Sequence, residues 1–136
     1  MMVSTKGRYA LRILVDLAKM DNGEFASVKD ISDNQRISLK YLESITAGLY
    51  RAGFVESRRG RNGGYKLAKS PAEITLNDIF SAMEGSTSAV ACLDHDGVLC
   101  GREEHCAGYP LWVKLQDIID NYLKGITLDD VLKGNF

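Results

Sequence analysis

Three cysteines and two histidines in one short stretch are the residues most able to do chemistry. Cys92, Cys100 and Cys106 are the only cysteines of the 136-residue chain, with seven and then five residues between them. His95 and His105 lie in the same stretch. This spacing is typical of neither CxxC zinc sites nor ferredoxin-type cluster sites. From the residues alone, the loop could hold an iron–sulfur cluster, hold zinc together with a histidine, or keep its thiols free.

A catalytic use of these cysteines has little support. A nucleophilic cysteine needs a nearby base, and His95 or His105 would have to serve. The chain has no glycine-rich phosphate-binding loop, and 136 residues leave no room for a separate substrate domain. The sequence therefore predicts a protein that is not an enzyme.

A second chemical feature is a very basic turn. Arg58, Arg59 and Arg61 fall within four residues and are interleaved with glycines up to Gly64. Strand-like residues flank the turn at 54–57 and 65–67, so a β-hairpin is predicted. Such a turn cannot bury its charge, and it can lay arginine along DNA phosphates or into a minor groove.

A helix is predicted immediately before this hairpin, from Ser38 as N-cap to Arg51. Its apolar residues recur at helical spacing and should form a buried stripe. The stripe consists of Leu39, Leu42, Ile45 and Leu49.

The elements before that helix complete a helix-turn-helix. Lys6 to Met20 reads as a first helix, and Ser27 to Asp30 resembles a capping box that starts a short helix to about Asn34. The helix from Ser38 is then the recognition helix, which enters the major groove in such units. A carboxylate there lowers DNA affinity unless it accepts from a cytosine amino group. The side chains expected to face DNA are Ser38, Lys40, Tyr41, Glu43 and Ser44.

Charge is segregated along the chain. Residues 1–70 hold 13 Lys and Arg against 7 Asp and Glu, whereas residues 71–136 hold 4 against 11. A basic front half fits a polyanion such as double-stranded DNA. No apolar run reaches about 18 residues and no signal-peptide pattern is present, so a soluble, cytoplasmic protein without membrane contact is expected.

After the hairpin, Thr75 is expected to cap a helix that ends at Gly85. A last long helix is predicted from Pro110 to Gly125. Its apolar face is too large for the core left at this end, and such a face usually meets another subunit. We expect a homodimer whose interface contains Trp112, Leu115, Ile119 and Tyr122.

Three motifs carry a resemblance to a known family: Lys6-Gly7-Arg8-Tyr9-Ala10, Ile37-Ser38-x-x-Tyr41-Leu42-Glu43 and Arg59-Gly60-x-x-Gly63-Gly64-Tyr65. Together they resemble the IscR/NsrR/CymR-like family of winged helix-turn-helix regulators, over nearly the whole chain. The resemblance implies a mainly α fold with a small β-hairpin and a long C-terminal dimerisation helix. It also implies that Glu43 helps to discriminate between types of DNA site. The expected division is 1–85 for DNA binding, 86–109 for the cysteine loop and 110–136 for dimerisation.

The resemblance also bears on the cysteines. In the iron–sulfur branch of the family, three cysteines lie between the helix after the wing and the dimerisation helix, as Cys92, Cys100 and Cys106 do. The resemblance thus implies a [2Fe–2S] or [4Fe–4S] cluster. The IscR members have a histidine three residues after the last cysteine, where this chain has Tyr109. The fourth ligand is therefore open among His105, His95, Tyr109, a carboxylate and a group from the partner subunit.

The sequence thus predicts a homodimeric, sequence-specific DNA-binding transcription regulator whose affinity for its operator is set by an iron–sulfur cluster. The alternative is a winged-helix repressor controlled by a protein partner or a small ligand, with zinc or free thiols in place of the cluster.

Overall fold

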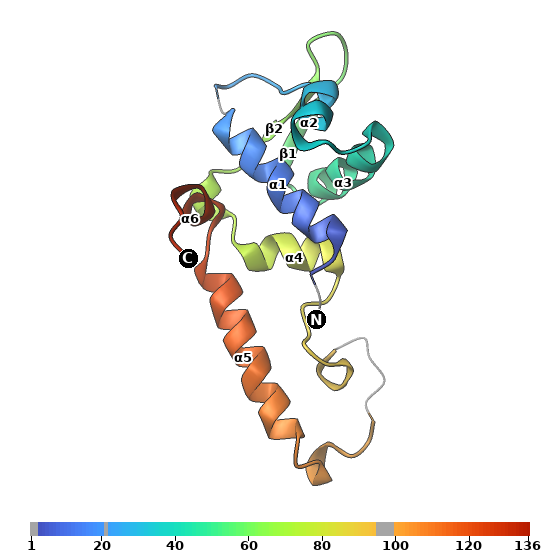
Figure 1. The fold of residues 1–136 in the computed structure, drawn as a ribbon, viewed down its shortest axis with the longest axis vertical. Coiled ribbons are helices and arrows are strands. Elements are labelled where there is room, and N and C mark those ends of the chain that lie inside the picture. The colour runs from blue at the N-terminus through green and yellow to red at the C-terminus, as the bar shows by residue number, and fades with distance from the viewer. Residues whose placement is uncertain (1–2, 21, 95–99) are drawn as a thin grey trace.

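One long helix projects from a small helical body that carries a β-hairpin (Figure 1). This computed structural model describes residues 3–20, 22–94 and 100–136. The predicted mainly α fold with a winged helix-turn-helix unit and a long C-terminal helix is confirmed. The elements are α1 (Thr5–Lys19), α2 (Val28–Gln35), α3 (Leu39–Arg51), β1 (Val55–Arg58), β2 (Gly64–Leu67), η1 (Pro71–Glu73), α4 (Leu76–Glu84), η2 (Ala91–Leu93), η3 (Glu103–His105), α5 (Tyr109–Gly125) and α6 (Leu128–Lys133).

Side-chain caps set where the first three helices begin. Ser4, Ser27 and Ser38 each accept from the backbone N–H three residues on, at 3.2, 3.0 and 3.3 Å. Each cap satisfies a donor that the first helical turn leaves unpaired. Between α2 and α3 the chain turns at Arg36, which has the left-handed φ of 54°. The predicted helix-turn-helix is therefore built as a short helix, a tight turn and the predicted recognition helix.

The buried stripe of α3 agrees with the prediction except at its first residue. Leu42, Ile45 and Leu49 are fully buried, but Leu39 is 50% exposed. Leu39 is the first residue of the helix, where the chain has not yet reached the core, so the expectation that it is buried was wrong. Thr46 is buried on this side instead, and its hydroxyl is satisfied by donating to the Leu42 carbonyl at 2.9 Å.

A third, very short segment pairs with the hairpin. β1 and β2 are antiparallel, with Val55 opposite Leu67 and Arg58 opposite Gly64. Ala26 bridges to Tyr65 on the other edge of β2, with both N–H···O bonds at 2.8–2.9 Å. Gly64 makes this close approach feasible, because it has φ +146° and a Cβ there would lie 1.8 Å from the Ala26 carbonyl oxygen.

Gly64→Ala is therefore expected to destabilise the fold, by about 1–3 kcal/mol or more, because the new methyl group overlaps backbone that has little room to shift. The free energy of unfolding in urea measures this. Gly125→Ala is the matched control, since nothing lies within 4 Å of a Cβ at Gly125. Equal stability of the two variants would contradict the assigned contact.

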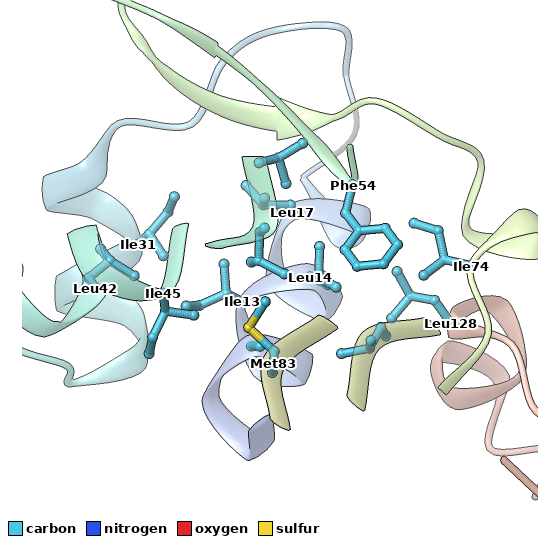
Figure 2. Packing of buried hydrophobic residues seen from close by; sticks show 14 of the residues in the cluster. Ile13, Leu14, Leu17, Ile31, Leu42, Ile45, Phe54, Ile74, Met83 and Leu128 are labelled. Carbon is cyan, nitrogen blue, oxygen red and sulfur yellow. The ribbon is translucent and has the colours of Figure 1, made fainter. Parts of the chain in front are cut away.

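The core gathers apolar side chains from both ends of the chain (Figure 2). Ile13 and Leu14 of α1 lie at its centre, and Ile74 and Leu128 close one side. The backbone is tied there too, because Leu128 N–H donates to the Ile74 carbonyl at 2.8 Å. The end of the chain thus packs against the winged-helix unit, while most of α5 extends away from it. None of the helices in the described residues is long and apolar enough to cross a bilayer.

Candidate nucleic-acid interface and cysteine loop

The outer face of α3 carries most of the side chains that were predicted to face DNA. Ser38, Lys40, Glu43 and Ser44 are exposed. Tyr41 differs, because it is half-buried and its ring makes an edge-to-face contact with Tyr9 of α1, with centroids 5.8 Å apart.

This contact belongs to a network that fixes the helix-turn-helix. The Arg12 guanidinium lies 4.9 Å from the centre of the Tyr9 ring. It also donates to Gln35 twice, from Nε to Oε1 at 3.0 Å and from Nη2 to the backbone carbonyl at 2.6 Å. Gln35 is the last residue of α2, so Arg12 satisfies a carbonyl that the helix end leaves unpaired. Arg12 and Tyr9 thus hold α2, the turn and Tyr41 in place against α1.

Three further residues share the exposed face of α3 and were not predicted there. Leu39, Ala47 and Tyr50 are exposed, with Tyr50 55% accessible. Ala47 and Tyr50 follow Glu43 by four and seven residues, so helical spacing alone could have placed them on the same face.

The wing presents its arginines at the tip of the hairpin. Arg58, Arg59 and Arg61 are all exposed and line a groove of about 500 Å³ between the turn and the start of α2. Arg58 differs from the other two, because its guanidinium stacks on Phe25 and donates to the Asn62 carbonyl.

The three cysteines do not form a preassembled site in the described part of the chain. Cys92, in η2, is partly buried, whereas Cys100 and Cys106 are exposed, and all three are free thiols. No three His, Cys, Asp or Glu side chains among the described residues come together in a way that could hold a metal ion. The donor chemistry fits a thiolate-bound cluster, but this arrangement of the described residues does not.

The candidate fourth ligands differ in their position and in their exposure to solvent. His105 is exposed in η3, and Tyr109 is the partly buried first residue of α5. His95 lies outside the described residues.

Glu103 engages the middle cysteine. The Cys100 thiol donates to its carboxylate at 3.7 Å, and the Gly101 N–H donates at 3.3 Å. The pKa of the Glu103 carboxyl is held below its usual range, mainly by its own backbone N–H; desolvation opposes this, and the donors at Gly101 and Cys100 lower the pKa further.

Gln116 ties the start of the cysteine loop to α5. Its Oε1 accepts from the Ala89 N–H at 2.6 Å, and its Nε2 donates to the Thr87 carbonyl at 3.1 Å and to Asp120 at 2.7 Å. Since η2 follows directly, Cys92 is held close to the middle of the long helix.

The long helix α5 has two apolar faces with different surroundings. Leu123 is buried and Ile119 is partly buried against the chain's own core. Trp112, Leu115 and Tyr122 are exposed, as are Leu111 and Ile118, which were not among the predicted interface residues. The residues at helical spacing form one exposed stripe: Leu111, Leu115, Ile118 and Tyr122, spaced by four, three and four residues. Trp112 directly follows Leu111 and so lies on another side of the helix.

Comparisons with known proteins agree with this architecture. Residues 3–134 match the Rrf2 family, described as an iron-dependent transcriptional regulator. The chain is 38% identical to the HTH-type transcriptional regulator IscR of Pectobacterium carotovorum over 134 residues, which are 98% of this chain and 80% of that protein. It is 37% identical to the HTH-type transcriptional regulator CymR of Bacillus subtilis over 131 residues, 96% of this chain and 89% of that protein.

Solved structures give the same result. The structure of CymR, titled the global cysteine regulator of B. subtilis, superposes with a TM-score of 0.78 at 36% identity, covering 98% of this chain and 97% of that one. T. potens IscR superposes with a TM-score of 0.73 at 34% identity, covering 100% and 89%. The named relatives are transcriptional regulators, which confirms that the chain is not an enzyme. The chain belongs to the Rrf2 family of transcriptional regulators.

Proposed function

We propose that the protein binds an operator in double-stranded DNA as a homodimer, and that the state of the loop from Cys92 to Cys106 sets its affinity. The observation that carries the DNA-binding part is the continuity of α3 with the wing. The exposed face of α3 leads directly into the hairpin with Arg59 and Arg61, at the end of the molecule opposite the start of α5 (Figure 1). A helix of this kind fits the major groove, and the arginine turn fits adjacent phosphates or a minor groove.

Arg59→Ala is expected to weaken operator binding by about 1–3 kcal/mol. The variant lacks the hydrogen bonds that the arginine would make in the DNA groove, and alanine makes no contact that replaces them. The measurement is a titration of a duplex selected by the wild-type protein from a randomised library, at fixed salt. Lys124→Ala removes a charge of the same sign from an exposed residue of α5, outside α3, the wing and the cysteine loop, and should bind as the wild type does.

Wild-type affinity in Arg59→Ala would contradict the assigned role of the wing. The salt dependence of the affinity tests whether the partner is DNA. About 6–10 phosphate contacts per dimer should give a steep loss of affinity with salt. A flat dependence would exclude DNA as the principal partner.

We assign the exposed stripe of α5 to contact with a second copy of the chain. Leu111, Leu115, Ile118 and Tyr122 are 39–61% exposed, and their spacing of four and three residues is that of a helix–helix seam. A symmetric pair of such helices would cover both stripes, and it would set the separation of two recognition helices on two half-sites.

For the loop, we propose an iron–sulfur cluster bound by Cys92, Cys100 and Cys106. The support is the set of three thiols between α4 and α5, which matches the iron–sulfur branch that the sequence resembles, and the description of the matched family as iron-dependent. A cluster would supply iron-bound thiolates that respond to oxidation or iron supply. The fourth ligand is proposed among His105, His95 and Tyr109. Because the described residues do not gather three ligands, binding requires the loop to rearrange.

A second candidate is control through the thiols without a cluster, by a partner or a small ligand. CymR relatives are about as similar to the chain as IscR relatives, and Cys100 already has a carboxylate partner. Purification without oxygen, followed by visible absorption and iron and sulfide analysis, separates the two. A coloured protein with stoichiometric iron and sulfide supports the cluster, and a colourless one supports thiol control.

A further inference from the structure

The structure assigns to Arg58 a role as a positioning residue of the wing, acting on DNA through Arg59 and Arg61. This rests on the proposed DNA-binding function. The Arg58 guanidinium carbon lies 4.5 Å from the centre of the Phe25 ring, and its Nη2 donates to the Asn62 carbonyl at 2.8 Å. One side chain thus joins β1, the far end of the turn and the segment before α2.

Phe25 is a fixed support for this contact. Its neighbour Ala26 is bonded to Tyr65 through both backbone groups, so the segment cannot shift along β2. On the Phe25 ring, Lys66 supplies a second cation at 4.8 Å, and Lys66 is in turn paired with Glu56 at 3.5 Å. Cations over aromatic faces are attracted by the ring's negative face. The partly buried ring is therefore flanked by side chains from both strands of the hairpin.

The turn depends on Arg58 because little else orders it. The paired register ends at Arg58 opposite Gly64. Within residues 59–63, the Gly63 N–H donates to the Gly60 carbonyl at 3.0 Å. The bond from Arg58 to Asn62 is the second constraint, and it spans the base of the turn.

The other two arginines are left for DNA. In the part of the chain that the structure describes, the side chains of Arg59 and Arg61 make no hydrogen bond, ion pair or ring contact. Their direction is set by the backbone of the turn, and hence by Arg58. The three wing arginines therefore divide into one that orders the turn and two that are presented by it.

Double-mutant cycles test this division, with the duplex selected by the wild-type protein as the probe. Arg58→Ala should weaken binding about three- to ten-fold in the wild-type background. Placed on Arg59→Ala/Arg61→Ala, the same change should have less than a two-fold effect, because there is no arginine left to position. If Arg58 instead contacts a phosphate itself, its full effect persists in that background, and the proposal is overturned.

Phe25→Leu tests the same proposal without changing the charge of the wing, because it removes the aromatic ring and keeps an apolar side chain. It should reproduce the loss seen in Arg58→Ala, and the two changes together should be no worse than either alone. Phe25→Tyr keeps the ring and should bind as the wild type does. Thermal unfolding of each variant separates loss of fold from loss of positioning. Wild-type affinity in a folded Phe25→Leu variant would overturn the proposal.

The outcomes also separate this inference from the proposed function. If the wild-type protein selects no duplex and its binding is insensitive to salt, the DNA-binding function fails. If it selects a duplex and Arg59→Ala weakens binding, but Arg58 and Phe25 behave independently, only the positioning role fails.

Discussion

Replacing Leu115 and Ile118 together with Glu is expected to convert the protein to a monomer and to abolish operator binding at concentrations where the wild type is saturated. Both side chains lie on the exposed stripe of α5, 39% and 56% accessible. Four carboxylates would then face one another across a symmetric seam of two helices, without partners and out of water. No subunit pair can offset that desolvation.

The loss of DNA binding follows from geometry. A dimer binds two half-sites, and the second contact is strengthened by the high effective concentration that the first creates. A monomer keeps its recognition helix and wing but loses this advantage, about 10²–10⁴-fold in affinity. Ile119 is unsuitable for this test, because it packs partly against the chain's own core and its replacement would also disturb folding.

The matched control places the same two charges on another part of α5. Val113→Glu with Asn121→Glu changes two exposed residues outside the stripe. That variant should sediment as a dimer and bind the operator. Sedimentation velocity gives the oligomeric state, and circular dichroism confirms that each variant is folded. A Leu115→Glu/Ile118→Glu protein that sediments as a dimer would show that the subunits meet elsewhere.

Local signals in the sequence were sufficient for the elements of this fold. Ser38 and Thr75 cap their helices as predicted, and Asp78 completes the capping box with Thr75. The tight turn with Gly60 and Gly63 closes the hairpin where the arginines predicted it. Such features depend on a few neighbouring residues, so one sequence contains all the information that they need.

Contacts between distant segments could not be predicted in the same way. Periodicity placed Leu39 in the buried stripe, but burial depends on where the rest of the core ends. The stack of Arg58 on Phe25 joins two segments that no local pattern connects. The same holds for Ile119, which packs partly against the core, where helical spacing had placed it on the expected dimer face.

The cysteine loop is where local sequence patterns predict the least about contacts. The types and order of its residues indicate thiolate chemistry, yet neither spacing nor resemblance identifies a fourth ligand. In the described residues Cys100 is paired with Glu103 and Cys92 lies beside a segment that Gln116 fastens to α5. The proposed cluster would need these contacts to be exchanged for others, and local sequence patterns do not show such a rearrangement.

Replacing Cys92, Cys100 and Cys106 together with Ala is expected to remove all bound iron and sulfide, and with them the visible absorption of the protein isolated without oxygen. Each single variant should lose most of the chromophore, because a cluster seldom survives the loss of one thiolate. The triple variant should remain folded, since Cys100 and Cys106 are exposed and Cys92 is only partly buried. Its affinity for the selected duplex should no longer change when oxygen is admitted or iron is chelated.

Two further variants identify the fourth ligand. If Tyr109 serves, Tyr109→Phe should shift the spectrum and speed loss of the cluster, whereas His105→Ala should do neither. If His105 serves, the pattern reverses, and if both leave the spectrum unchanged the ligand is His95 or another group. Arg102→Ala, exposed in the same segment, is the control for general disturbance of the loop. A triple cysteine variant that keeps its iron, its sulfide and its DNA response would exclude the cluster at this site. A colourless wild type whose DNA binding responds to thiol alkylation would instead establish control by the free thiols.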